Sequence, residues 1–155
     1  MLRKVRKTNA PGTGGRFAIV ASNYNARYVD AMVRAAKAEL ARANAESVVV
    51  YRVPGAFEIP VVASKLADVA SPPLSAIICL GVILRGATRH AEQIGQTITH
   101  GLMHVQLRFQ LPVVHEVLLL ENEQQARERC LDRNHNRGLE AAQTALQMAV
   151  LMRTL

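Results

Sequence analysis

Several features are scarce or absent in the 155-residue sequence, and each absence excludes a class of protein. No run of about 18 apolar residues exists, which excludes a transmembrane helix. The two cysteines, Cys79 and Cys130, are too few for a disulfide scaffold and lack the spacing of a zinc site. The basic start at residues 1–16 has no apolar segment, so we do not expect a secretory signal. A cytoplasmic protein in a reducing compartment is therefore expected.

Acidic residues are absent from residues 1–16, which carry five of the basic residues. The net charge is +7, so only +2 remains for the rest of the chain. Residues 11–15 (PGTGG) are typical of a linker, which predicts a flexible basic tail over residues 1–15 and one domain over residues 16–155. Aromatic side chains that could stack on bases are few and include no tryptophan. We therefore expect no nucleic-acid partner, and without an apolar span we expect no membrane partner.

Apolar patterning predicts the class of this domain. Half of the residues are hydrophobic and a fifth are charged, which suffices for one buried core. Short apolar runs typical of buried strands lie at residues 17–21, 47–53, 76–83 and 112–120. Helical spacing of apolar side chains is found at residues 27–44, 59–70, 89–109, 123–131 and 138–153. This alternation predicts an α/β layered domain with a mainly parallel sheet.

Ligands of such sheets bind beyond the carboxyl ends of the strands, in loops that lead into helices. The rule selects four stretches, at residues 22–25, 54–58, 82–90 and 115–121. In the third, backbone N–H groups at a helix start and a glycine for close approach could form an anion site, with Arg85 and Arg89 adding positive charge. Thr88 could equally be a helix cap. His90 is a candidate general acid or base, or an ordinary polar surface residue.

The segment VPGAFEIP at residues 53–60 fixes a rigid turn after a strand. Its Glu58 is either an acceptor for substrate hydroxyl or amine groups or a carboxylate in the first turn of a helix. Tyr24 could lie under a ring or at the rim of a site. The arginines Arg129, Arg133 and Arg137 are either a phosphate clamp or a solvated helix face. His100 and His104 lack a third ligand, so we expect no metal site.

These segments, taken together and in this order, resemble the lumazine synthase family over about residues 17–152. The most specific are VPGAFEIP at 53–60 and RGATRH at 85–90, which matches the family's arginine-glycine-x-threonine-x-histidine pattern. EQQARER at 123–129 and RGLEAA at 137–142 add support. The resemblance implies a flavodoxin-like three-layer sandwich with a four-stranded parallel sheet. It also implies a homopentamer, or a multiple of it, with active sites between subunits, and it makes riboflavin synthase a candidate partner.

The implied reaction belongs to riboflavin biosynthesis. It joins 5-amino-6-ribitylaminouracil to 3,4-dihydroxy-2-butanone 4-phosphate, releases phosphate and water, and gives 6,7-dimethyl-8-ribityllumazine. No metal or organic cofactor is implied. His90 would shuttle protons, and Tyr24 would stack on the pyrimidine.

The resemblance assigns binding roles to the other residues. The ribityl chain would be held by Ala56, Phe57 and Glu58. The ring pocket would be lined, through backbone contacts, by Val82, Ile83 and Leu84. The phosphate would be bound by Ala87, Thr88 and, from the adjoining subunit, Arg129. The ring would be covered from the neighbouring subunit by His115.

Two adjacent residues depart from the family pattern: His115 and Glu116 stand where an aromatic residue and a glycine are common. An alternative is therefore a flavodoxin-like module that holds a lumazine or flavin without turnover. A third hypothesis, a basic RNA-associated protein, predicts that deleting residues 1–15 removes the function and that salt weakens binding steeply. The presence of Glu58, His90 and Arg129 favours the enzyme. The choice between a pentamer, paired pentamers and a shell stays open.

Overall fold

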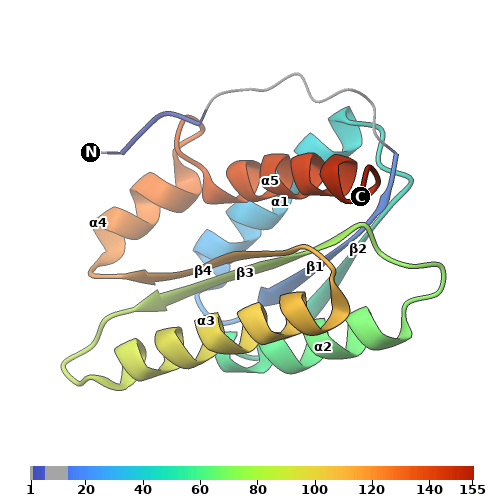
Figure 1. Ribbon diagram of the computed structural model, residues 1–155. Coiled ribbons are helices and arrows are strands. Elements are labelled where there is room, and N and C mark those ends of the chain that lie inside the picture. Colours follow the sequence, from blue (N-terminus) through green and yellow to red (C-terminus); the bar gives the residue numbers. More distant parts are fainter. Residues whose placement is uncertain (1, 6–13) are drawn as a thin grey trace.

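A four-stranded parallel sheet forms the centre of the computed structural model, which describes residues 2–5 and 14–155. Its strands follow the order β2-β1-β3-β4. They are β1 (Arg16–Ser22), β2 (Ser47–Val53), β3 (Ala76–Leu84) and β4 (Val113–Leu120). One face is covered by α1 (Ala26–Arg42) and α5 (Arg137–Met152), and the other by α2 (Ile59–Val69) and α3 (His90–Phe109) (Figure 1). The predicted three-layer α/β sandwich is confirmed.

Alternating side chains of the central strands build a core on each side of the sheet. In β1, Phe17 and Ile19 pack toward α1 and α5, whereas Ala18 and Val20 pack toward α2 and α3. Because both faces are covered, a central strand has no polar face, and its sequence is a continuous apolar run. The predicted strands and longer helices consequently agree with the observed bounds to within two residues.

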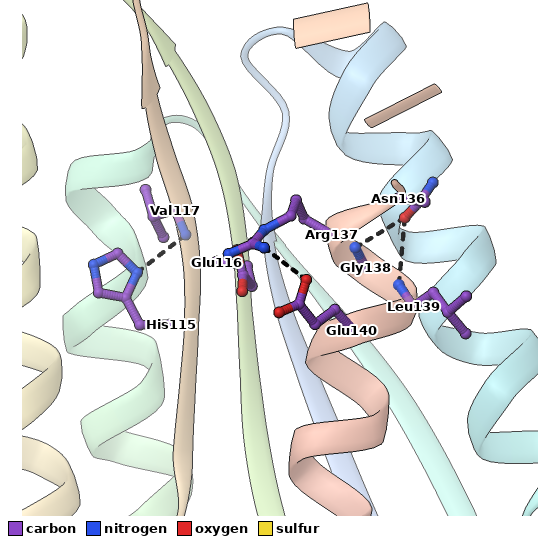
Figure 2. Close-up of polar contacts among 8 residues, drawn as sticks. All are labelled: His115, Glu116, Val117, Asn136, Arg137, Gly138, Leu139 and Glu140. Atoms are coloured by element: carbon purple, nitrogen blue, oxygen red, sulfur yellow. Dashed lines mark hydrogen bonds and ion pairs between the residues drawn. The ribbon is translucent and has the colours of Figure 1, made fainter. Parts of the chain in front are cut away.

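The segment between β4 and α5 departs from the predicted single helix. The helix α4 (Glu123–Ala126) continues as a π-helical turn, η2 (Arg127–Leu131), and the chain then leaves helical geometry before α5. Asn136 fixes the start of α5: its Oδ1 accepts from Gly138 N at 2.8 Å and from Leu139 N at 3.3 Å (Figure 2). Its Nδ2 donates to the carbonyl of Cys130 at 2.6 Å. The cap thus ties η2 to α5.

The structure describes only part of the predicted basic tail. Residue 1 and residues 6–13 lie outside the described residues, so the flexible tail over residues 1–15 stays a prediction. The backbone N–H of Val5 donates to Asn134 O at 2.7 Å, which places residues 2–5 beside the segment that precedes α5. Within the described part of the chain, no helix is both long and apolar enough to cross a membrane.

Candidate functional site

A pocket of about 450 Å³ lies beyond the carboxyl ends of β1, β2 and β3, as expected for a parallel sheet. It is bounded by the loop after β1, the turn after β2, the end of β3 and the first turns of α3. The lining residues named by the sequence analysis are Tyr24, Ala56, Phe57, Glu58, Val82, Ile83, Leu84, Thr88 and His90. Four segments that are distant in the sequence therefore meet at one site.

The loop after β1 is held by hydrogen bonds to both neighbouring strands. Asn25 adopts the left-handed conformation, with φ 57°, and its Nδ2 donates to Val82 O at 2.7 Å. Tyr24 N donates to Pro54 O at 3.1 Å. These bonds fix the backbone, while the Tyr24 residue remains 73% exposed at the rim. An exposed ring on a fixed backbone suits stacking against a planar ligand.

The turn after β2 presents a carboxylate to the pocket. The 3₁₀ helix η1 (Ala56–Glu58) follows Gly55, whose backbone N–H donates to Glu58 Oε2 at 2.9 Å. The bond orients the carboxylate, which can accept further hydrogen bonds because it has about four lone-pair sites. Both roles considered for Glu58 from the sequence therefore apply: its carboxylate stabilises a helix start and also faces the pocket.

The segment that enters α3 differs from the expected cationic loop. Arg85 Nε lies 3.1 Å from Glu121 Oε2, and its Nη2 lies 4.0 Å from Glu92 Oε1. Its charge is therefore balanced by carboxylates, and the expectation that Arg85 adds positive potential to the pocket is wrong. Thr88 Oγ1 accepts from His90 N at 3.4 Å, so its hydroxyl helps to start α3.

A second cavity, of about 620 Å³, lies between α4, η2, α5 and residues 2–5. It shares no lining residue with the first pocket. Arg129 and Arg137 line it, but Arg133 does not, because the helix ends at Leu131 before a third turn. For Arg133, the hypothesis of a phosphate clamp of three arginines is therefore wrong. Among the described residues, Arg129 Nε and Gln143 Nε2 are buried polar atoms without a hydrogen-bond partner.

Glu116 is buried behind this cavity, on the face of β4 that α5 covers. Its Oε2 lies 3.2 Å from Arg137 Nε, and Arg137 Nη1 lies 2.6 Å from Glu140 Oε2 (Figure 2). Removal from water raises the pKa of Glu116 to about 7, although the charges of Arg137 and Arg129 oppose the rise. The carboxyl therefore changes charge near neutral pH.

Replacing Glu116 with glutamine is expected to remove a pH-dependent loss of stability. The folded protein binds this proton more tightly than the unfolded chain, because the pKa rises from 4.5 to about 7 on folding. The stabilisation is complete below the unfolded value and is lost as the pH rises through the folded value. From about pH 5 to about pH 8, the wild type should lose on the order of 3 kcal/mol relative to Glu116→Gln, measured as the free energy of unfolding in urea.

Glu140→Gln is the matched control, because Glu140 contacts the same arginine but its side chain is 41% exposed. Its difference from the wild type should change much less over the same pH range, because burial raises the pKa of Glu116 more than the charge of Glu140 does. A Glu116→Gln variant whose stability changed with pH in parallel with the wild type would contradict a buried carboxyl that binds a proton on folding.

His115 points to the opposite face of β4, toward α3 (Figure 2). Its Nδ1 accepts from Val117 N at 3.1 Å, so this nitrogen carries no proton. Its Nε2 lies 2.8 Å from Thr99 Oγ1, whose own proton is donated to Gly95 O. The ring therefore donates Nε2–H to Thr99 and is neutral. Burial also lowers the pKa of His115, so the ring presents an uncharged aromatic face.

Comparison with known proteins decides the family. The sequence profile of the 6,7-dimethyl-8-ribityllumazine synthase family matches residues 14–153. The chain is 41% identical over 145 residues to the 6,7-dimethyl-8-ribityllumazine synthase of Xanthomonas euvesicatoria pv. vesicatoria, covering 92% of this chain and 93% of that one. It is 44% identical over 145 residues to that of Stenotrophomonas maltophilia, covering 90% of each. The chain belongs to the 6,7-dimethyl-8-ribityllumazine synthase family.

The residues that the lumazine synthase resemblance singled out fall into three places. Nine line the first pocket, and Ala87 lies in the loop beside it without lining it. Arg129 lines the second cavity. His115 lies on the α3 side of β4 and is absent from the lining of both cavities. Within one subunit, Arg129 and His115 are thus apart from the pocket that holds His90.

Sequence reasoning missed two residues that line the pocket of this lumazine synthase family member. They are Ala91 and Ile94; Asn25, Gly55 and Gly86 also line the pocket and lie within the selected stretches, but were not among the site residues named from the family resemblance. Ile94 is one turn beyond His90 on α3, so helical spacing could have found it. The role of Asn25 depends on its bond to a distant strand, which no local pattern indicates.

Proposed function

We propose that this chain catalyses the condensation of 5-amino-6-ribitylaminouracil with 3,4-dihydroxy-2-butanone 4-phosphate, which yields 6,7-dimethyl-8-ribityllumazine, phosphate and water in riboflavin biosynthesis. The observation that carries the proposal is the pocket at the strand ends, where the two most specific family segments, 53–60 and 85–90, meet. Membership of the 6,7-dimethyl-8-ribityllumazine synthase family supports the same reaction.

The pocket offers a position for each part of the pyrimidine substrate. In the proposal, Tyr24 stacks on the ring, and the backbone of residues 82–84 forms hydrogen bonds to the ring edge. The turn at residues 56–58 holds the ribityl hydroxyls, with Glu58 as the charged acceptor. His90, at the first residue of α3, is then the proton shuttle for imine formation and phosphate elimination.

The phosphate end of the second substrate leads to a proposal about assembly. Ala87 and Thr88 bind the phosphate together with Arg129, which lines a different cavity of its own subunit. We therefore propose a homopentamer, or a multiple of it, in which Arg129 and His115 complete the site of a neighbouring subunit. Exposed apolar side chains on α3 support an assembled state: Met103 is 51% exposed and Leu107 is 69% exposed.

Two further proposals concern the surroundings of the enzyme. A cytoplasmic location is supported by Cys79 and Cys130, which are free and buried. Burial raises the pKa of the Cys130 thiol to about 12, so this thiol stays protonated and unreactive. Riboflavin synthase as a protein partner rests on family membership alone.

Arg129→Ala is expected to raise KM for the butanone phosphate by about 10- to 100-fold with little change in kcat. The reason is the loss of a charge-assisted hydrogen bond to the phosphate, made in the ground state as well as in the transition state. Steady-state kinetics at saturating ribityl pyrimidine measures the effect. Arg133→Ala is the control, since Arg133 is exposed and lines neither cavity. An unchanged KM for Arg129→Ala would remove this arginine from the site.

The reaction itself is tested by mixing the purified protein with both substrates and recording lumazine absorbance against the uncatalysed background. A rate that depends on enzyme concentration is expected. No rate above background, together with tight binding of a lumazine or flavin, would contradict the proposal and indicate a binding module. His115 and Glu116 would then be the first residues to replace with the aromatic residue and the glycine that are common in the family.

A further inference from the structure

Glu116 is the charged residue that the proposed reaction leaves unexplained. Only 9% of it is exposed, and its neighbour across the sheet is Leu80 of β3, so the strands offer it no charged partner. Among the elements on this side of the sheet, η2 and α5 bring charged and titratable groups next to it. They are Arg129 and Cys130 of η2, and Arg137 and Glu140 of α5.

These groups differ in how fully they are paired. Arg137 is held between two carboxylates, at 3.2 Å from Glu116 and at 2.6 Å from Glu140. Arg129, in contrast, has a buried Nε without a hydrogen-bond partner among the described residues. Gln143 is only 6% exposed, lines the same cavity and has an Nε2 that likewise lacks a described partner. The cavity therefore presents unused donors beside a buried carboxyl.

The net charge of this cluster depends on one proton. With Glu116 ionised, the two carboxylates balance Arg129 and Arg137; with Glu116 protonated, one positive charge is left over. The other charged or titratable groups that line the cavity are Arg3, Lys4, Glu128 and His135. None of these four is among the charges that shift the pKa of Glu116, which are those of Arg137, Glu140 and Arg129.

We propose that Glu116 is a positioning residue for phosphate binding: its carboxyl takes up a proton from solvent when a phosphate dianion binds at Arg129, and its ionised form weakens that binding. The inference rests on the proposed function for the identity of the phosphate compound. It follows from the geometry because a buried carboxylate and a phosphate beside the same arginines repel each other, and protonation of the carboxylate removes the repulsion. The coupling is reciprocal: if protonation of Glu116 raises the affinity for phosphate by some factor, bound phosphate raises the proton affinity of Glu116 by the same factor.

The pKa of Glu116, raised by burial to about 7, places this exchange near neutral pH. KM for the butanone phosphate should therefore rise above neutral pH in the wild type. In Glu116→Gln, which keeps the shape but not the charge, this part of the rise should vanish. The ratio of the wild-type KM to the variant KM is expected to increase about tenfold between about pH 6.5 and about pH 8.5.

Taking the ratio of the two KM values cancels the effect of every other titrating group, since all of them are common to both proteins. Glu140→Gln serves as the control, because Glu140 pairs with the same arginine from an exposed position. It should keep most of the pH dependence of the wild type, since burial raises the pKa of Glu116 more than the charge of Glu140 does. A merely structural Glu116 would change KM by a constant factor at every pH. Parallel pH profiles for the wild type and Glu116→Gln would overturn the inference.

Calorimetric titration with inorganic phosphate at about pH 8, in two buffers of different ionisation enthalpy, tests the same proton without turnover. The assembled wild type should take up a fraction of a proton for each phosphate bound, and Glu116→Gln should take up less. If the variant fails to fold, the wild-type titration decides alone, and absence of uptake overturns the inference. Lumazine formation without uptake would refute only the role of Glu116, whereas uptake without lumazine formation would refute only the proposed reaction.

Discussion

Gly138→Ala should lower the free energy of unfolding by about 4 kcal/mol or more. A Cβ at this position would lie 2.1 Å from the carbonyl oxygen of Met32 and 2.6 Å from the Cα of Met32. These are backbone atoms of α1, so no side-chain rotation relieves the overlap, and α5 must move away from α1. The gain in helix propensity, about 1 kcal/mol, is too small to compensate. Urea denaturation at fixed protein concentration measures the change.

Gly95→Ala is the matched control for this substitution. Gly95 lies inside α3, and the atom nearest to a new Cβ there is Leu119 Cδ2 at 3.7 Å, an ordinary contact. Only the propensity term applies, so the variant should be as stable as the wild type or more stable by up to about 1 kcal/mol. If both variants changed stability by similarly small amounts, the close contact of α1 and α5 would be wrong.

His90→Ala is expected to lower kcat for lumazine formation by about 100-fold, while inorganic phosphate still binds. The loss is that of a positioned proton shuttle at the start of α3. The remaining rate should stay above background, because the pocket still holds the two reactants side by side, which supplies a large part of the acceleration. Steady-state kinetics gives kcat, and calorimetric titration gives phosphate affinity.

His104→Ala provides the comparison, since His104 lies on the same helix, is exposed and lines none of the pockets described here. It should leave kcat unchanged. A His90→Ala variant that loses phosphate binding together with activity would show that His90 binds the phosphate rather than moving protons.

The fold could be predicted because its strands and helices have different apolar periods. Strands such as 76–84 are buried on both faces and are therefore continuous apolar runs, while α1 and α5 show helical spacing. The π-helical turn η2 was not predictable, because its sequence has the same apolar spacing as an ordinary helix. The position of Arg137 depends on that turn and on the Asn136 cap.

The loops that form the pocket could be predicted, because the carboxyl ends of parallel strands share one edge of the sheet. What the sequence could not provide was the pairing of charges. Arg85 was expected to add positive charge to the site, yet it pairs with Glu121, which directly follows the neighbouring strand β4. Glu116 was visible as a departure from the family pattern, but its burial and its contact with Arg137 depend on how α5 packs against β4.

The central claim, that a site of one subunit is completed by its neighbour, is tested most directly by mixing two defective variants. His90→Ala and Arg129→Ala subunits are dissociated, combined in equal amounts and reassembled, and lumazine formation is measured well below KM. In a ring of head-to-tail interfaces, about a quarter of the sites should carry both wild-type residues, and the mixture should reach about a quarter of wild-type activity. A mixture no more active than the average of the two variants would contradict a shared site.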